Sequence, residues 1–368
     1  YEASPFKDMG TSNPNGSQRY YIGHVDWTGV NGLIEYTGSD KFSAVLQMGT
    51  SSQKYQWEGF YTAAPSTLSR KITVDGGYIK GGANYRANDS SNFFFNVGQI
   101  MRPPSFDGVF PNADYDFEEA DEILNESFTS FELGYGFRSS NFKGTINAYH
   151  TVWGDRTLRR STSIDDQGVR IIYSGVEQTH QGIEGEMTWY PSSRLRVKGM
   201  VSLGDWKYTK NFQGDAYFID NNQPAGTTGT LYLDGVKIGD AAQTVLYLGF
   251  DYKVSSKLSV DLDMMSYDNL HGRFGPLDSE FNSANNRGSI KLPSWGTADL
   301  GATYSFSLLG YDARARLNVN NLFDEEYLSQ SQTNFHNDGG RTWNGVNVEN
   351  NVYFGKGTTW NLGLNINF

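Results

Sequence analysis

Cysteine is absent from the 368 residues, and proline is scarce at 10. Without cysteine the chain can form neither disulfides nor thiolate metal sites, and it has no cysteine nucleophile. No apolar run reaches the ~18 residues that a transmembrane helix needs, and the mean hydropathy is −0.54. These averages still permit a membrane β-barrel, because its strands expose only alternate residues to lipid.

Basic blocks and catalytic motifs are also missing. The formal net charge is −11, so we do not expect nucleic acid as a partner. Neither G-x-S-x-G nor H-E-x-x-H occurs, and the five histidines show no ligand spacing. We therefore expect no enzymatic activity, no cofactor and no metal site.

Glycine and aromatic residues are abundant, with 42 Gly, 23 Tyr and 23 Phe, a composition that favours strands and turns. Six segments share one pattern: a strand that ends in aromatic residues, a short polar turn, and a second alternating strand. This pattern predicts six β-hairpins. The segments are 31–48, 81–98, 132–149, 184–202, 248–264 and 300–319.

The connections between these hairpins are much longer than the turns within them. Short turns at one end and long loops at the other are typical of an up-and-down antiparallel barrel that crosses a membrane. We therefore predict an all-β transmembrane β-barrel, with thirteen strands: two from each of the six hairpins and one that runs to Phe368. The long loops are expected at 50–77, 102–127, 154–180, 208–243, 269–293 and 325–357.

The strands alternate between an apolar and a charged face. Leu262 lies on the apolar face of its strand, whereas Asp261 and Asp263 lie on the other. A charge facing hydrocarbon would cost about 2–4 kcal/mol near the midplane, so we expect the charges in the lumen. A soluble β-sandwich with charged outer faces is the alternative. Aromatic residues before the short turns would form an interfacial girdle: Tyr36, Tyr85, Tyr135, Phe137, Trp189, Phe250, Tyr252, Tyr304 and Phe306.

One hairpin also predicts an acid–base ladder. Glu184 and Glu186 precede its turn, and Arg196 and Lys198 follow it on the same face. Cross-strand partners on one face are close enough to interact. We expect these four side chains to pair inside the wall.

The odd strand count bears on the domain organisation. Single-chain bacterial barrels normally have an even number of strands, and the first identifiable strand, 30–37, already runs toward a short turn. We expect residues 1–29 to be the end of an extracellular loop. Residues 30–368 would then be the C-terminal part of a transmembrane β-barrel.

Several motifs resemble one family of outer-membrane proteins. The stretch RARLNVNNLFDEEYLSQ (314–330) resembles the penultimate strand and turn of TonB-dependent receptors. Segments 80–106 and 175–191 resemble two further hairpins of that family, and the motif sequences are similar to those of receptors from Bacteroidetes. The terminal Phe368 resembles the signal read by the barrel assembly machinery. The matching motif residues are Asn318, Asn321, Leu322, Phe323, Asp324 and Tyr327.

The resemblance implies a plugged barrel of about 22 strands, of which this chain would supply the last thirteen or so. The family's plug and its TonB-contacting box have no counterpart in the sequence. The implied partners are the TonB complex, through a plug not present in this chain, the barrel assembly machinery and outer-membrane lipids. The penultimate-strand motif resembles the receptors of the family that lack a surface lipoprotein lid more than those that have one, and a lipoprotein partner is the alternative. The implied location is the outer membrane of a Gram-negative bacterium.

The function implied by the resemblance is TonB-dependent active import of a scarce solute: a siderophore, a haem-like compound, a peptide or a glycan. A passive porin or a channel for long-chain solutes is the alternative. Arginines in the long loops suit anionic groups, and aromatic residues suit flat or sugar-like faces. Packing of the loops on themselves is the other explanation for these residues. The candidate solute contacts are Tyr55, Trp57, Tyr61, Arg156, Arg159, Arg160 and Trp343.

Overall fold

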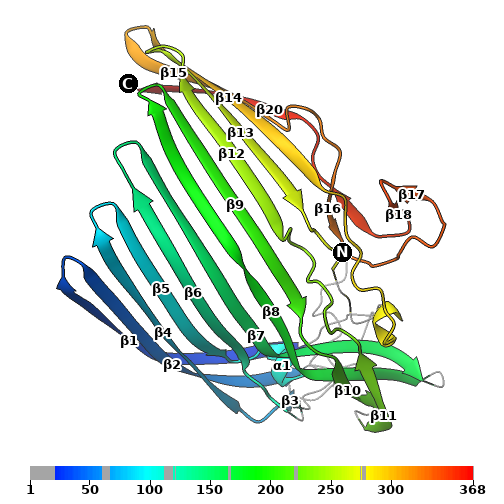
Figure 1. The fold of residues 1–368 in the computed structure, drawn as a ribbon. Coiled ribbons are helices and arrows are strands. Elements are labelled where there is room, and N and C mark those ends of the chain that lie inside the picture. The colour runs from blue at the N-terminus through cyan, green and yellow to red at the C-terminus, as the bar shows by residue number, and fades with distance from the viewer. Residues whose placement is uncertain are drawn as a thin grey trace.

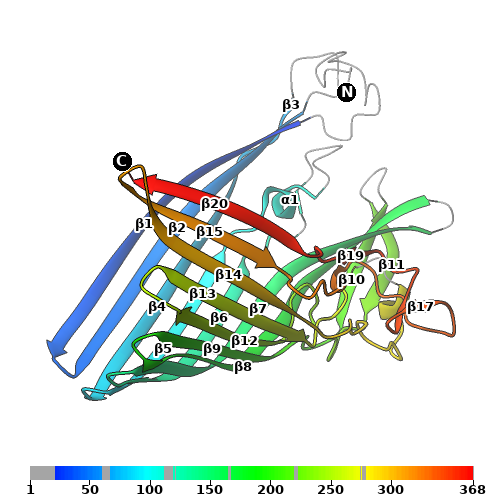
Figure 2. The ribbon, with the colours of Figure 1, turned by 90° about the horizontal axis from the view of Figure 1, so that it is seen from above.

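The computed structural model describes residues 21–59, 67–111, 119–120, 122–164, 167–218, 223–273, 275 and 279–367. Thirteen strands follow one another in a single antiparallel sheet, which curves into a wall (Figures 1 and 2). They are β1 (Tyr21–Ser39), β2 (Phe42–Gly59), β4 (Ile72–Asn88), β5 (Ser91–Arg102), β6 (Glu126–Arg138), β7 (Phe142–Ile164), β8 (Gln167–Ser192), β9 (Leu195–Tyr208), β12 (Thr244–Lys253), β13 (Leu258–Asp268), β14 (Trp295–Leu308), β15 (Tyr311–Asn320) and β20 (Thr359–Asn367).

The predicted all-β fold, the six hairpins and the thirteen-strand count are confirmed. Three further short strands join the sheet away from this path: β3 (Thr67–Leu68), β10 (Phe212–Phe218) and β11 (Pro224–Leu231). Two small hairpins lie in the last long loop: β16 (Leu328–Ser331) with β19 (Val352–Phe354), and β17 (Thr342–Trp343) with β18 (Val346–Asn347). The described residues contain no helix long and apolar enough to cross a membrane.

A serine closes four of the six short turns in the same way. In each turn its hydroxyl oxygen accepts a hydrogen bond from the backbone N–H three residues later, at 3.0–3.2 Å. This local bond offers the backbone a turn in place of continued strand pairing. The β14–β15 turn instead places Leu309 and Gly310 at positive φ, as a two-residue hairpin loop requires. The four serines are Ser39, Ser139, Ser192 and Ser255.

Two of the expected boundaries are wrong, because the strands continue past the predicted wall. β1 begins at Tyr21, inside the stretch 1–29 that we expected to be loop, and it pairs with β2 from Tyr21 opposite Gly59. Most of the expected loop 154–180 is also strand, since β7 ends at Ile164 and β8 begins at Gln167. Alternating apolar residues in this extension are buried in a loop core and so stabilise its extended form.

The described loop residues form three hydrophobic cores of their own. The largest joins the extended β7–β8 hairpin, β10, β11 and the 3₁₀ helix η2 (Ser279–Asn282). A second core packs the loop ends of β2 and β4 against the short helix α1 (Phe106–Val109). The third joins the loop after β13 to the β16–β19 and β17–β18 hairpins. These cores pack the loops together at the loop end of the wall.

Candidate functional site

The wall has two chemically different faces. One face, which we call the belt face, carries Leu258, Val260, Leu262 and Met264 in β13. Among the described residues, the half of each of the thirteen strands that adjoins a short turn carries no charged side chain on the belt face. The nine predicted girdle aromatics all lie on this face. Such an uncharged band flanked by aromatic residues is typical of a lipid-facing barrel surface.

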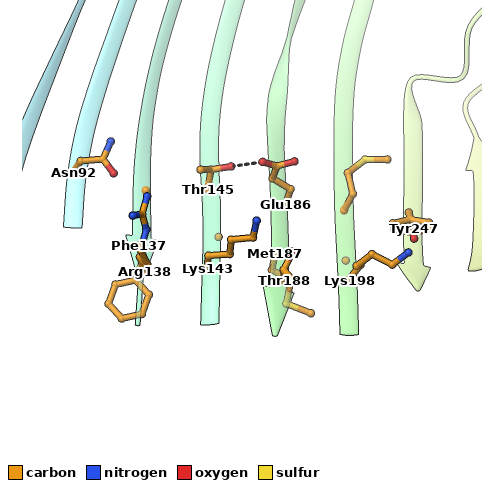
Figure 3. A pocket seen from close by; sticks show the side chains of 14 residues that line it. Asn92, Phe137, Arg138, Lys143, Thr145, Glu186, Met187, Thr188, Lys198 and Tyr247 are labelled. Atoms are coloured by element: carbon orange, nitrogen blue, oxygen red, sulfur yellow. Dashed lines mark hydrogen bonds between the residues drawn. The ribbon is translucent and has the colours of Figure 1, made fainter. Parts of the chain in front are cut away.

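The opposite face, which we call the lumen face, is polar and hollowed. Four cavities are lined mainly by its residues. Figure 3 shows one of them, across β5 to β12, where the hydroxyl of Thr145 donates to Glu186 at 3.4 Å. Lys143, Glu186 and Lys198 contribute charged groups to the same cavity. The predicted placement of charges on one face and apolar residues on the other is thus observed.

Ion pairs run across the lumen face, some between paired strands and some between strands that are not neighbours. The ammonium of Lys198 in β9 lies 3.6 Å from Asp251 in β12 and 3.1 Å from Asp263 in β13. Arg196 donates to Asp251 at 2.8 Å. Gly249 stands between Lys198 and Asp263 in the register, and a Cβ there would lie 2.8 Å from the Lys198 side chain. The missing side chain lets the lysine cross β12.

The same device recurs two strands further on. Arg316 in β15 donates two hydrogen bonds to Asp261 in β13, at 2.8 and 2.9 Å, and a third to Thr303 in β14 at 3.0 Å. A Cβ on Gly301 would overlap the Asp261 carboxylate. A glycine in the intervening strand again makes room for an ion pair between second neighbours.

The predicted ladder between Glu184, Glu186, Arg196 and Lys198 is wrong in its partners. Glu184 accepts a hydrogen bond from Ser202 at 3.3 Å, and Glu186 lies opposite Met200. The two cations instead pair with Asp251 and Asp263 on the other side of β9. Both basic side chains find carboxylates there, which the hairpin considered alone does not reveal.

The arginines of the extended β7–β8 hairpin lie at the loop end of the lumen face. The Arg156 guanidinium stacks 3.9 Å from the centre of the Trp153 ring and donates to Gln178 at 3.1 Å. Arg159 donates to the backbone carbonyl of Asp107 in α1. The side chain of Arg160 lies outside the described part of the structure. The hairpin therefore brings two of the three predicted arginines toward the centre of the loop region.

The predicted aromatic contacts lie mainly in hydrophobic cores. Tyr55 and Trp57 are only 1% and 3% exposed, and they pack with Val109 and Phe110 in the second loop core. Trp343 packs against the third core and meets Phe354 edge-on at 5.2 Å. Tyr61 lies outside the described residues. In this conformation the two buried rings offer a solute almost no surface, and their contacts are those of packing.

The family-motif residues fasten the end of β15 to its neighbours. Asn321 adopts a left-handed φ of 48° and is 5% exposed. Its side chain donates to the carbonyls of Glu325 and Lys356 at 3.0 and 3.1 Å and accepts from the N–H of Glu325 at 2.9 Å. Asp324 accepts from the Thr358 N–H at 2.8 Å. These bonds turn the chain out of β15 and hold the segment that leads into β20.

The other motif residues lie around this turn. Asn318 bridges β15 to β20 by donating to Asn361 at 2.8 Å. The Leu322 N–H donates to the Ala298 carbonyl at 2.7 Å, and Phe323 is largely exposed. Tyr327 stacks 3.8 Å from Trp295, which itself stacks on Tyr267. Phe368 lies outside the described residues.

Burial and hydrogen bonds to charged partners shift the pKa values of several titratable groups in the loops, among them His271 and Glu280. Burial lowers the pKa of His271, and nearby Lys237 and Lys291 lower it further. The Nδ1–H of its ring donates to the Asn269 carbonyl at 3.1 Å. Hydrogen bonds from Arg287 lower the pKa of Glu280. The same arginine lies 2.5 Å from Asp338 and so links the loop after β13 to the last loop.

Sequence reasoning missed the polar residues around Arg156. Trp153, Gln178 and His180 lie in the upper parts of β7 and β8, and Gln178 is almost fully buried. The Trp153 Nε1 and His180 Nε2 atoms are buried and have no hydrogen-bond partner among the described residues. The sequence could have indicated them, because Gln178 and His180 alternate on one face of the same strand and Trp153 comes just before the arginine-rich stretch 156–160.

A sheet with an uncharged belt outside and ion pairs inside defines the wall of a transmembrane β-barrel. The chain belongs to the TonB-dependent receptor-like β-barrel family, whose model matches residues 5–322. This confirms the resemblance inferred from the sequence motifs. No curated protein matches the sequence.

Solved structures share the fold at low identity. The siderophore receptor PiuA from Acinetobacter baumannii is 14% identical, with a TM-score of 0.65 over 94% of this chain and 43% of that one. The unliganded ferric citrate transporter FecA is 12% identical (TM-score 0.63; 94% and 45% covered). The copper transporter OprC is 14% identical (TM-score 0.58; 94% and 48% covered). The chain thus spans less than half the length of these structures.

Proposed function

We propose that this chain forms wall and capture loops of an active transporter that imports a scarce solute across the outer membrane of a Gram-negative bacterium. The observation that carries the proposal is the two-faced wall: an uncharged belt outside and a polar, ion-paired lumen face inside. A wall of this kind separates lipid from a polar passage. Energy would come from the TonB complex, as the family name implies.

The solute class rests on the similar structures and on the loops. The similar proteins are described as a siderophore receptor, a ferric citrate transporter and a copper transporter. A siderophore or another metal-bearing small molecule is therefore the class we favour over a peptide or a glycan. Arg156 and Arg159 are the loop contacts we retain, because both are placed at the loop end of the lumen face.

Solute uptake by the bacterium that carries the gene tests the proposal. Cells with and without the gene are grown in spent medium, and mass spectrometry follows which small molecules disappear. We expect at least one metal-bearing solute to be depleted only when the gene is present, and a protonophore to stop its depletion. Depletion that continues with the protonophore, together with steady conductance of the purified protein in planar bilayers, would favour the passive porin.

A further inference from the structure

The lumen face carries a compact polar cluster at the base of the β7–β8 extension. Trp153, Gln178 and Tyr208 lie directly opposite one another on β7, β8 and β9. In the next row toward the short turns, His180 lies opposite Trp206. Arg156, from the β7–β8 extension, stacks on the Trp153 ring of this surface. We call these six residues the Arg156 cluster.

The charge of Arg156 is not balanced by a carboxylate. Its polar contacts among the described residues are with neutral groups, the side-chain oxygen of Gln178 and the Tyr208 hydroxyl, and no ion pair between described residues involves it. Arg102, at the end of β5, differs from Arg156 because it forms an ion pair with Glu126 in β6. A partly desolvated guanidinium without a counter-charge attracts anions strongly, and its planar N–H groups match carboxylate and phosphate oxygens.

Two further polar atoms of the cluster lack partners. Trp153 Nε1 can only donate, and His180 Nε2 can donate or accept according to its tautomer. Both are buried without a hydrogen bond among the described residues, whereas Trp206 Nε1 donates to the Tyr149 hydroxyl at 2.8 Å. A buried polar group without a partner is unfavourable, so a ligand that supplies the missing hydrogen bond is favoured. The unpartnered donors and the cation lie on one face, within two adjacent cross-strand rows.

The packing around the cluster keeps it in place. Phe128 also stacks on Trp153 with ring centres 5.0 Å apart, and the His180 ring lies 5.5 Å from that of Trp206. Gly182 and Gly204 lie in the row below, and a Cβ on either would come within 2.8 Å of the Tyr149 hydroxyl or of Trp206 Nε1. The site is therefore built from the strands of the wall and does not depend on a loop closing over it.

We propose that the Arg156 cluster binds an anionic group, a carboxylate or a phosphate, of the imported solute. Arg156 would bind the oxygens through its guanidinium, and Trp153 Nε1 and His180 would supply hydrogen bonds at the edge of the group. This inference rests on the proposed transport function, and it narrows the solute to one that carries a negative charge at its outward end. The cluster lies on the lumen face at the base of the β7–β8 extension, next to the loops.

Calorimetry on the purified protein in detergent tests the site, with inorganic phosphate and tricarballylate as probes and glycerol as the neutral comparison. Arg156→Gln is compared with Arg314→Gln, which removes an exposed arginine from the lumen face far from the cluster. We expect saturable binding of at least one anion, weakened about tenfold or more by Arg156→Gln and unchanged by Arg314→Gln. Binding of tricarballylate alone would assign a carboxylate, and binding of phosphate alone a phosphate.

Two results would overturn the proposal. One is the absence of saturable anion binding to the folded wild-type protein, which would mean that water fills the cluster. The other is equal weakening by both substitutions, which would indicate general attraction to a polar lumen. Uptake separates this proposal from the transport function: energy-dependent uptake undiminished by Arg156→Gln would refute only the subsite. Heat-modifiable migration in gels confirms that both variants are folded.

Discussion

Arg316 reaches across β14 to form a two-point ion pair with Asp261, at 2.8 and 2.9 Å, and Gly301 leaves the space through which it passes. The pair joins β13 to β15, which share no backbone hydrogen bonds. Ion pairs across neighbouring strands typically contribute about 0.2–1 kcal/mol each. A pair that spans three strands also opposes sliding of β14 between its neighbours.

Gly301→Ala should separate this ion pair. The added Cβ would overlap the Asp261 carboxylate, so the two side chains must move apart. Gly363→Ala is the matched control, because it lies opposite Arg316 in β20 and its Cβ would meet nothing within 4 Å. We expect Gly301→Ala to lower the urea midpoint of the folded barrel, whereas Gly363→Ala leaves it equal or higher. Equal midpoints for both variants would contradict this account of Gly301.

A charge placed on the belt face should impair membrane assembly. Leu262→Arg puts a guanidinium in the middle of the belt, at an expected cost of about 2–4 kcal/mol. Ser307→Arg places the same side chain at an exposed position of the lumen face, opposite Asp312. We expect much less folded protein for Leu262→Arg, measured as the heat-modifiable fraction in outer-membrane extracts. If both variants assemble equally well, the assignment of the two faces is incorrect.

Much of the wall could be predicted from the sequence, because its information is local. Side-chain alternation such as Leu258 to Met264 defines a strand and its faces, and a serine such as Ser255 defines a turn within three residues. The partners of Lys198 could not be predicted in the same way. They depend on Gly249 in the next strand, 51 positions away in the chain, and on Asp263 beyond it.

The loops were less predictable because long-range contacts determine their structure. The positive φ of Gly175 and the register shifts near Arg156 move the extended β8 residues onto a new face. Tyr173 then packs with Phe212 and Phe281, which come from two other loops. No local pattern indicates that these segments meet. For the same reason Tyr55 and Trp57 read as solute contacts in the sequence, although they pack against α1 in the structure.

Asn321 should be needed for its backbone conformation and for its amide group. Asn321→Ala would lose three side-chain hydrogen bonds and place a non-glycine, non-asparagine residue at a φ of 48°. Asn321→Gly would lose the same bonds and tolerate the backbone. We expect both to destabilise the barrel in thermal unfolding, by about 2–4 kcal/mol for Ala, with Gly less severe. An alanine variant as stable as the wild type would show that the turn is held by other contacts.

The third loop core should loosen in mild acid because of His271. Burial lowers the pKa of this histidine below the value near 6.5 that it has in the unfolded chain. The unfolded loop then binds the proton more tightly, so the stabilisation is complete above pH 6.5 or so and is lost as the pH falls toward the folded pKa. Lys237 and Lys291 also disfavour the protonated ring, whereas Asp268 and the hydrogen bond to Asn269 favour it and offset part of the lowering of the pKa.

Hydrogen exchange of the loop amides between Leu270 and Leu292 measures this effect. Protection factors, corrected for the intrinsic pH dependence of exchange, should be constant above about pH 6.5 and should decrease below it. His271→Gln keeps a polar side chain but cannot titrate, so its protection should not change over the same range. The wall amides of β13 provide an internal reference, because they do not contact the third core. A decrease of the same size in the His271→Gln variant would assign the acid sensitivity to another group, of which Asp268, paired with Lys291 at 2.8 Å, is the nearest candidate.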